Sequence, residues 1–185
     1  MGVAYTYVGI KRNILGIMEV VMGFLSSFRK KSPWILHYNT GGCNGCDIEI
    51  LSALAPKYDI ERFGMLNRGN PKQADILLVT GPVTKRCRDV LRRLYLEMPE
   101  PKVVVAMGAC AHGGGIFRDF YHVENGVDNI IPVDVWIPGC APRVEAVIDG
   151  MVEAVKIWEK KSKEKEYLRG HSEELLKKLG VKNDD

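Results

Sequence analysis

The chain has 185 residues, of which 46% are hydrophobic and 26% are charged, and its formal net charge is +3. These values are typical of one packed domain with extensions, and the charge is too small to indicate a nucleic-acid partner. Five cysteines occur without a recognisable secretory signal, which favours a reducing, intracellular compartment where cysteines bind metals or do redox chemistry.

Residues 1–31 are predicted to form a docking segment. Residues 13–28 are mostly apolar, but they are too few for a transmembrane helix, and Glu19 interrupts them. As an amphipathic helix flanked by basic residues such as Arg12 and Arg29, they suit a membrane interface or a groove on a membrane-embedded partner. Packing of this helix on its own domain is the alternative.

Between residues 32 and 158 the pattern alternates between strands and helices. Strands are predicted at 34–39, 58–63, 75–80, 102–107 and within 130–137, and helices at 48–54, 84–98 and 143–158. Continuous apolar strands between helices are typical of a parallel sheet that is covered on both faces. We therefore predict an α/β fold, a flavodoxin-like open parallel sheet with helices on both faces.

Residues 159–185 are predicted to be a charged C-terminal extension. The first part, 159–166, is densely charged, and Gly170 is expected to separate it from a short terminal helix at 172–179. Such charge runs are usually solvated faces, and a partner-binding tail is the alternative.

Four cysteines stand in turns that follow three of the predicted strands. Cys43 and Cys46 follow 34–39, and the other two, Cys110 and Cys140, follow 102–107 and 130–137. Because the carboxyl ends of parallel strands share one edge of a sheet, where ligands bind, we expect these cysteines to converge. Cys87 is different, since it belongs to the apolar face of its helix and behaves there as a small hydrophobic residue.

Four convergent cysteines allow three kinds of site. Tetrahedral zinc also takes four cysteines, but its usual sign is two close pairs. A dithiol redox motif would use Cys43 and Cys46 and leave Cys110 and Cys140 unexplained. A [4Fe–4S] cluster accounts for all four, and glycine turns offer it N–H groups and a close backbone. The residues favour the cluster, with zinc and dithiol chemistry as the alternatives.

These motifs resemble the iron–sulfur subunit shared by respiratory complex I (its 20 kDa subunit) and the membrane-bound, energy-converting [NiFe] hydrogenases, including the related archaeal membrane-bound sulfane reductase. The similarity covers about residues 32–158 and is carried by residues 40–49, 75–84, 91–102, 107–115 and 131–142. It implies one [4Fe–4S] cluster, held by Cys43, Cys46, Cys110 and Cys140. In the hydrogenases this cluster is proximal to the nickel–iron centre of a large subunit, and in complex I it is the last carrier before quinone.

The sequence combines features of both branches of the family. Cys43 and Cys46 are spaced as in hydrogenases, whereas complex I subunits usually place these two ligands side by side. The stretches 98–102 and 107–115 look closer to complex I. This mixture suits an archaeal membrane-bound hydrogenase or sulfane reductase, and it leaves the terminal acceptor open among protons, sulfane sulfur and quinone.

Several other polar residues lie near the cysteines. Glu49, one turn after Cys46, is a candidate proton relay, and a solvated or salt-bridged glutamate is the alternative. Asp47 favours a helix N-terminus, although an anionic cluster would oppose it. His112 either donates a hydrogen bond to a cluster sulfur or faces a partner subunit. The remaining histidines show no partner pattern: His37, His122 and His171.

We therefore predict an oxidoreductase subunit that carries electrons and has no substrate site of its own. The resemblance places it at the cytoplasmic face of the cell membrane, between a ferredoxin-like iron–sulfur subunit and a large catalytic subunit of the hydrogenase or complex I type. Integral membrane subunits that pump ions are the other implied partners. The alternatives are a stand-alone dithiol oxidoreductase that uses Cys43 and Cys46, and a zinc-stabilised structural module.

Overall fold

The computed structural model describes residues 32–178, with side chains described up to residue 165. The docking segment predicted for residues 1–31 lies outside these residues. Over residues 32–178, no helix is both long and apolar enough to cross a membrane.

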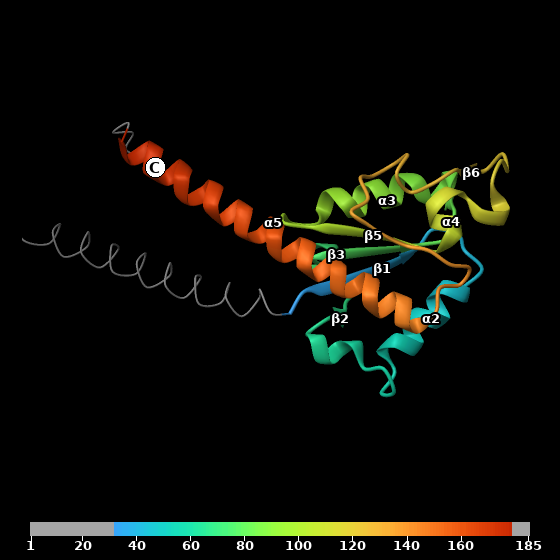
Figure 1. Ribbon diagram of the computed structural model, residues 1–185. Helices are drawn as coiled ribbons and strands as arrows, with labels where there is room; N and C mark the ends of the chain where they lie inside the picture. The colour runs from blue at the N-terminus through green and yellow to red at the C-terminus, as the bar shows by residue number, and fades with distance from the viewer. Residues whose placement is uncertain (1–31, 179–185) are drawn as a thin grey trace, which may run out of the picture. The chain divides into compact units, whose positions relative to one another are not determined.

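Five parallel strands form a sheet in the order β2-β1-β3-β5-β7 (Figure 1). Counted along the chain this is the order 2-1-3-4-5 of flavodoxin-like folds, so the predicted architecture is confirmed. The strands are β1 (Trp34–Asn39), β2 (Leu66–Asn67), β3 (Ile76–Thr80), β5 (Val103–Met107) and β7 (Val135–Ile137).

Helices cover both faces of the sheet (Figure 1). On one face α2 (Gly45–Leu54) and α5 (Val144–Lys178) contribute to one apolar cluster. On the other face α3 (Lys85–Glu97) and α4 (Gly108–Gly113) contribute to a second. Because β3 and β5 lie between these two layers, every one of their residues is buried, as the continuous apolar runs predict.

One predicted strand is wrong. Within residues 58–63 the chain forms the 3-10 helix η1 (Ile60–Phe63), between Asp59 and Gly64, whose φ angles are 47° and 83°. Left-handed residues on either side prevent an extended run. The edge strand β2 follows and is only two residues long. The remaining short elements are η2 (Pro71–Gln73), η3 (Gly115–Phe117) and an antiparallel pair of β4 (Val83–Thr84) and β6 (Val123–Glu124).

The last helix, α5, runs from Val144 to Lys178 without a break, so the predicted interruption at Gly170 is wrong. A glycine inside a helix costs only about 1 kcal/mol relative to alanine, and the surrounding Lys, Glu and Leu are good helix formers. The expected boundary between residues 158 and 159 also falls inside this helix. Beyond it, Lys161 still donates to Asp134 (2.7 Å) and to the Lys102 carbonyl (3.1 Å).

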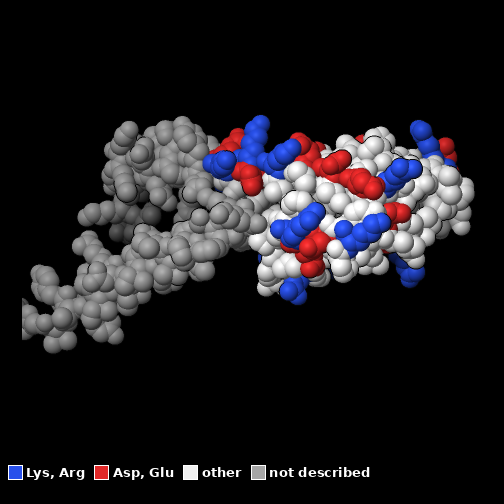
Figure 2. Space-filling model, turned by 60° about the horizontal axis from the view of Figure 1, so that its bottom comes forward, with Lys and Arg blue, Asp and Glu red and all other residues white. Residues whose placement is uncertain are grey.

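Charged side chains of both signs are interspersed on the face shown in Figure 2. Toward the right-hand end of the molecule in this view, most of the surface is uncharged. Two large apolar side chains of α2, Ile48 and Leu51, are 61% and 64% exposed. The carboxyl edge of the sheet therefore borders an apolar surface.

Candidate metal centre

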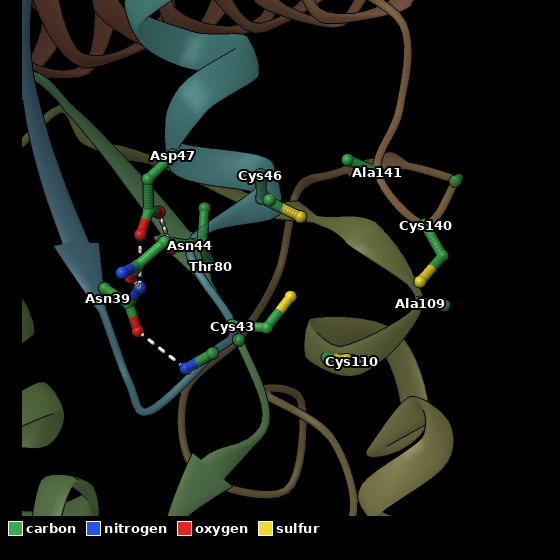
Figure 3. Close-up of a pocket in the computed structure, with 14 residues that line it drawn as sticks. Asn39, Cys43, Asn44, Cys46, Asp47, Thr80, Ala109, Cys110, Cys140 and Ala141 are labelled. Carbon is green, nitrogen blue, oxygen red and sulfur yellow. Dashed lines mark hydrogen bonds between the residues drawn. The ribbon is translucent and has the colours of Figure 1, made fainter.

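The four cysteines of the predicted site line one cavity of about 110 Å³ at the carboxyl edge of the sheet (Figure 3). Cys43 lies in the loop after β1, Cys46 at the start of α2, Cys110 in α4, and Cys140 in the loop between β7 and α5. In Figure 3 the sulfurs of Cys43, Cys46 and Cys140 point toward the same space. The parallel topology thus brings together residues from three distant parts of the chain.

The loop that carries Cys43 is shaped by the end of β1. The Asn39 Oδ1 atom accepts hydrogen bonds from the backbone N–H groups of Gly41 (2.8 Å) and Gly42 (2.7 Å). Asn44 then adopts a left-handed conformation with φ 67° before α2 begins. Only Cys46 therefore lies in α2, which begins three residues earlier than the helix predicted at 48–54, and Cys43 lies in the loop before it.

Two glycines leave room beside the sulfurs. A Cβ atom on Gly108, whose φ is +89°, would lie 2.7 Å from the Cys46 sulfur. A Cβ atom on Gly115, whose φ is +54°, would lie 2.8 Å from the Cys110 sulfur. Any other residue would fill this space and strain the backbone. The backbone therefore lies close to the sulfurs. A sulfur-rich group bound here would need N–H donors at this short range.

The crowded thiols disfavour their own ionisation. Burial, then the neighbouring Cys110 and Asp47 and the other two thiols, raise the pKa of Cys46 to about 11. Burial and the nearby Cys140 and Cys43 also raise the pKa of Cys110, while a hydrogen bond from the Ile116 backbone lowers it. Bound cations would offset this repulsion, because they favour the thiolate form.

The cavity leaves room for a group of several atoms between the four cysteines. In a tetrahedral zinc site the sulfurs lie only about 3.8 Å apart. Among the described side chains, no three or more His, Cys, Asp or Glu residues approach closely enough to hold a single metal ion. A dithiol motif would use Cys43 and Cys46 alone and would leave Cys110 and Cys140, which line the same cavity, without a role. The cysteines instead surround a cavity, which suits a multi-atom cluster.

A polar network lies against the Cys43–Cys46 side of the cavity. The Asp47 carboxylate accepts hydrogen bonds from Thr80 Oγ1 (2.7 Å) and from Asn39 Nδ2, and it pairs with His37 Nε2 at 3.0 Å. The same His37 nitrogen lies 3.1 Å from Thr80 Oγ1. His37 thus has partners, which corrects its interpretation from the sequence. Its spacing from Asn39, two residues along β1, is the signal that both face α2.

The other candidate residues lie outside the cavity lining. Glu49 is half-buried on α2. His112 is exposed, and its ring meets that of Trp136 edge-on with the centroids 4.5 Å apart. Cys87 is half-buried on α3, and burial followed by its hydrogen bond with Tyr38 raises the pKa of that tyrosine to about 12. The fifth cysteine therefore stands apart from the other four.

The fold is that of a class of α/β chains found in hydrogenases. A NAD+-reducing [NiFe]-hydrogenase in the H2-reduced state contains a chain that matches with a TM-score of 0.54 at 20% identity, covering 67% of this chain and 91% of that chain. At this identity the likeness shows the fold alone. The model of the family "NADH ubiquinone oxidoreductase, 20 Kd subunit" matches residues 43–154, and the chain belongs to this family.

Closer relatives carry more specific names. The probable membrane-bound hydrogenase subunit mbhJ of Pyrococcus furiosus is 50% identical over 139 residues, 75% of this chain and 83% of that protein. Formate hydrogenlyase subunit 7 of Escherichia coli is 46% identical, over 71% of this chain and 52% of that protein. A chain of the archaeal membrane-bound sulfane sulfur reductase is 37% identical with a TM-score of 0.63, covering 83% of this chain and 89% of that chain.

These relationships confirm the resemblance seen in the sequence. The protein is an oxidoreductase subunit of the complex I and hydrogenase type, from a family whose members bind iron–sulfur groups and work inside membrane complexes. Such a subunit acts together with partner subunits.

Proposed function

We propose that the chain carries one [4Fe–4S] cluster on Cys43, Cys46, Cys110 and Cys140. It passes single electrons from a ferredoxin-like iron–sulfur subunit to a large catalytic subunit of the hydrogenase or complex I type, at the cytoplasmic face of the membrane. The observation that carries this proposal is the glycine-lined cavity of about 110 Å³ that all four cysteines line.

The residues around the cavity have defined tasks in this proposal. When bound, the cluster supplies one-electron chemistry. The four cysteines hold it as thiolates, and the Ile116 backbone N–H donates to the Cys110 sulfur. Gly108 and Gly115 keep side chains out of the space beside the sulfurs. A rigid, crowded site of this kind keeps the surroundings fixed when the charge changes.

The surface around the cavity supports docking of the large subunit. Cys43 and Cys140 are exposed, although an iron–sulfur group of this type favours dry surroundings. Large apolar side chains stand beside the cysteines, with Ile48 61% exposed and Ile116 78% exposed. Exposed apolar patches of this kind mark interaction sites. A partner seated here would exclude water and bring its own redox centre close. At this interface Glu49, half-buried on α2, is the proposed proton relay.

The terminal acceptor depends on the partner. The similar proteins belong by name to a membrane-bound hydrogenase, a formate hydrogenlyase and a sulfane sulfur reductase. The same electron-carrying site can serve each of these reactions, because the acceptor binds elsewhere. Integral membrane subunits complete the proposed assembly, with residues 1–31 as the docking segment.

Removal of one ligand from the assembled complex tests electron transfer. In the anaerobically purified complex, Cys140→Ala should abolish the reduced-cluster EPR signal of this chain and stop electron delivery to the large subunit. The signals of the iron–sulfur donor should remain. Undiminished delivery in this variant would contradict the proposal.

A pair of surface variants tests the docking face. Ile116→Glu places a charge beside the cavity and should prevent co-purification with the large subunit while the cluster signal is kept. Leu96, 71% exposed on α3, is the matched control, and Leu96→Glu should assemble normally. Normal assembly of Ile116→Glu would place the large subunit on another surface.

A further inference from the structure

Asn39, the last residue of β1, contacts the loop that carries Cys43 on both sides of this cysteine. Its Oδ1 atom accepts hydrogen bonds from the N–H groups of Gly41 (2.8 Å) and Gly42 (2.7 Å), which precede the cysteine. Its Nδ2 atom donates to the Oδ1 atom of Asn44 (3.3 Å), which follows it. A single side chain therefore spans the loop.

The main chain of this loop makes few other contacts. Among the residues that the structure describes, no hydrogen bond between main-chain groups involves Gly41, Gly42 or Cys43. The Cys43 residue is exposed. The loop packs on Gly81, because a Cβ atom on Gly42 would lie 3.0 Å from the Gly81 Cα atom. Without the Asn39 side chain, the two glycines would gain the conformational freedom that glycine has more than any other residue.

The other end of the Asn39 carboxamide fixes its orientation. The Nδ2 atom also donates to the Asp47 carboxylate, which accepts from Thr80 Oγ1 at 2.7 Å as well. A carboxylate only accepts hydrogen bonds and a main-chain N–H group only donates. An amide turned by 180° would therefore place oxygen against oxygen and N–H against N–H. The side chain has one favourable orientation, in which Asp47 on α2 holds it against the loop.

We propose that Asn39 is the positioning residue of the ligand Cys43. This rests on the proposed function. Asn39 keeps the loop in the shape that presents the Cys43 sulfur to the cavity (Figure 3) before iron arrives. Because the loop is ordered in advance, less conformational entropy is lost when iron binds. The same contacts keep the sulfur on the metal afterwards, and loss of a group that orients a ligand costs about 10- to 100-fold in metal affinity.

Hydrogen exchange of the iron-free full chain, followed by mass spectrometry, tests the order of the loop. In Asn39→Ala the N–H groups of Gly41 and Gly42 lose their acceptor, so their exchange should become about tenfold faster. Asn70→Ala is the matched control. The Asn70 Oδ1 atom likewise accepts from the N–H group two residues later, at Lys72 (3.1 Å), but it lies outside the cavity lining. This variant should leave exchange of the two glycines unchanged.

Iron retention tests the consequence for the metal centre. The anaerobically loaded full chain is mixed with a chelator of ferrous iron, and the rate at which iron is lost is measured. Asn39→Ala should take up iron but lose it roughly tenfold faster than the wild type, because the Cys43 sulfur is no longer held in place. Asn70→Ala should lose iron at the wild-type rate.

An exchange of two side chains separates positioning from general destabilisation. The double variant combines Asn39→Asp with Asp47→Asn. Its carboxylate at position 39 can accept from Gly41 and Gly42, and its amide at position 47 can donate to that carboxylate. The bonds to the loop and the net charge are kept, so slow exchange and slow iron loss should both return. Asn39→Asp alone places two carboxylates side by side and should not restore them.

The outcomes separate this role from the function on which it rests. Wild-type exchange and wild-type iron loss in Asn39→Ala, or no recovery in the double variant, would overturn the role of Asn39 alone. A wild-type chain that holds no iron–sulfur cluster would overturn the proposed function, whereas exchange of the iron-free loop would still show whether Asn39 orders it. Should Asn39→Ala fail to fold, Asn39→Gln provides the same comparison, because it moves the carboxamide by one methylene group.

Discussion

The two sides of the cavity are built differently. The side of Cys43 and Cys46 is backed by polar side chains, with Asp47 held by Asn39 and by two further donors. The side of Cys110 and Cys140 is backed by main chain. There Gly115 lies against the Cys110 sulfur, and the Ala109 N–H donates to the Gly139 carbonyl at 2.8 Å.

This difference separates two tasks. Main chain and glycine on the second side determine the positions of the sulfurs, because any added side-chain atom collides with them. Polar side chains on the first side determine the charge near the sulfurs, because hydrogen bonds and nearby charges set the reduction potential of an iron–sulfur site. Changes on the glycine side should therefore abolish binding of the cluster, whereas changes on the polar side should shift its potential.

The largest effect is expected for Gly108→Ala, at the position where the two sides meet. The new Cβ would lie 2.7 Å from the Cys46 sulfur, and φ is +89°, a conformation that costs a non-glycine residue on the order of 1–3 kcal/mol. We expect most of the iron to be lost, as measured by metal analysis of the anaerobically purified chain. Gly113→Ala is the matched control, because its Cβ meets nothing within 4 Å. If both variants kept their full iron content, Gly108 would not be needed to leave room beside the Cys46 sulfur.

The next largest effect is expected from pH during loading of the site. Cys46 and Cys110 lie on opposite sides of the cavity, and the pKa of each thiol is raised in the metal-free chain. Each thiol must lose its proton to bind iron, so binding releases protons and is favoured as the pH rises. For Cys46 this gain continues until about pH 11, the pKa of that thiol. The iron that the protein retains in competition with a chelator at about pH 6.5, 7.5 and 8.5 measures this pH dependence. Equal amounts of retained iron at all three pH values would contradict the account.

A smaller effect is expected for Asp47→Asn on the polar side. A unit charge on the order of 8 Å away, at an effective dielectric constant of about 20, is worth about 2 kcal/mol. Loss of the carboxylate should therefore raise the reduction potential and favour reduction by roughly tenfold or more, with the iron content unchanged. Thr80→Val leaves the charge in place and should shift the potential less. Loss of iron in Asp47→Asn would show that this carboxylate also sets geometry.

Elements with strong local signals could be predicted closely from the sequence. The first strand was expected at 34–39 and is found there. Thr84 was expected to begin the following helix, and its hydroxyl accepts from the Cys87 N–H at 3.4 Å. Continuous apolar runs locate β3 and β5, because a strand buried on both faces needs no alternation. From these strands the convergence of the cysteines follows, whereas their role as ligands stays a proposal.

Features that depend on tertiary contacts could not be predicted. The partnership of His37 requires the register of β1 against β3, in which Asn39 lies opposite Thr80, and the position of α2 above them. Two local features depend on small differences in backbone energy, which the identity of a single residue does not reveal. These features are the left-handed residues around η1 and the continuation of α5 through Gly170. Hence the cysteines were found from spacing, and the polar network only from the fold.

The most direct test of the central claim is metal analysis with EPR spectroscopy on the anaerobically purified protein and its five single Cys→Ser variants. The account predicts four irons per chain and a reduced cubane signal that is lost or strongly altered in the Cys43, Cys46, Cys110 and Cys140 variants. Cys87→Ser should keep both. A colourless protein that contains zinc, or a cubane that survives unchanged without Cys110 and Cys140, would contradict the claim that these four cysteines hold one iron–sulfur cluster.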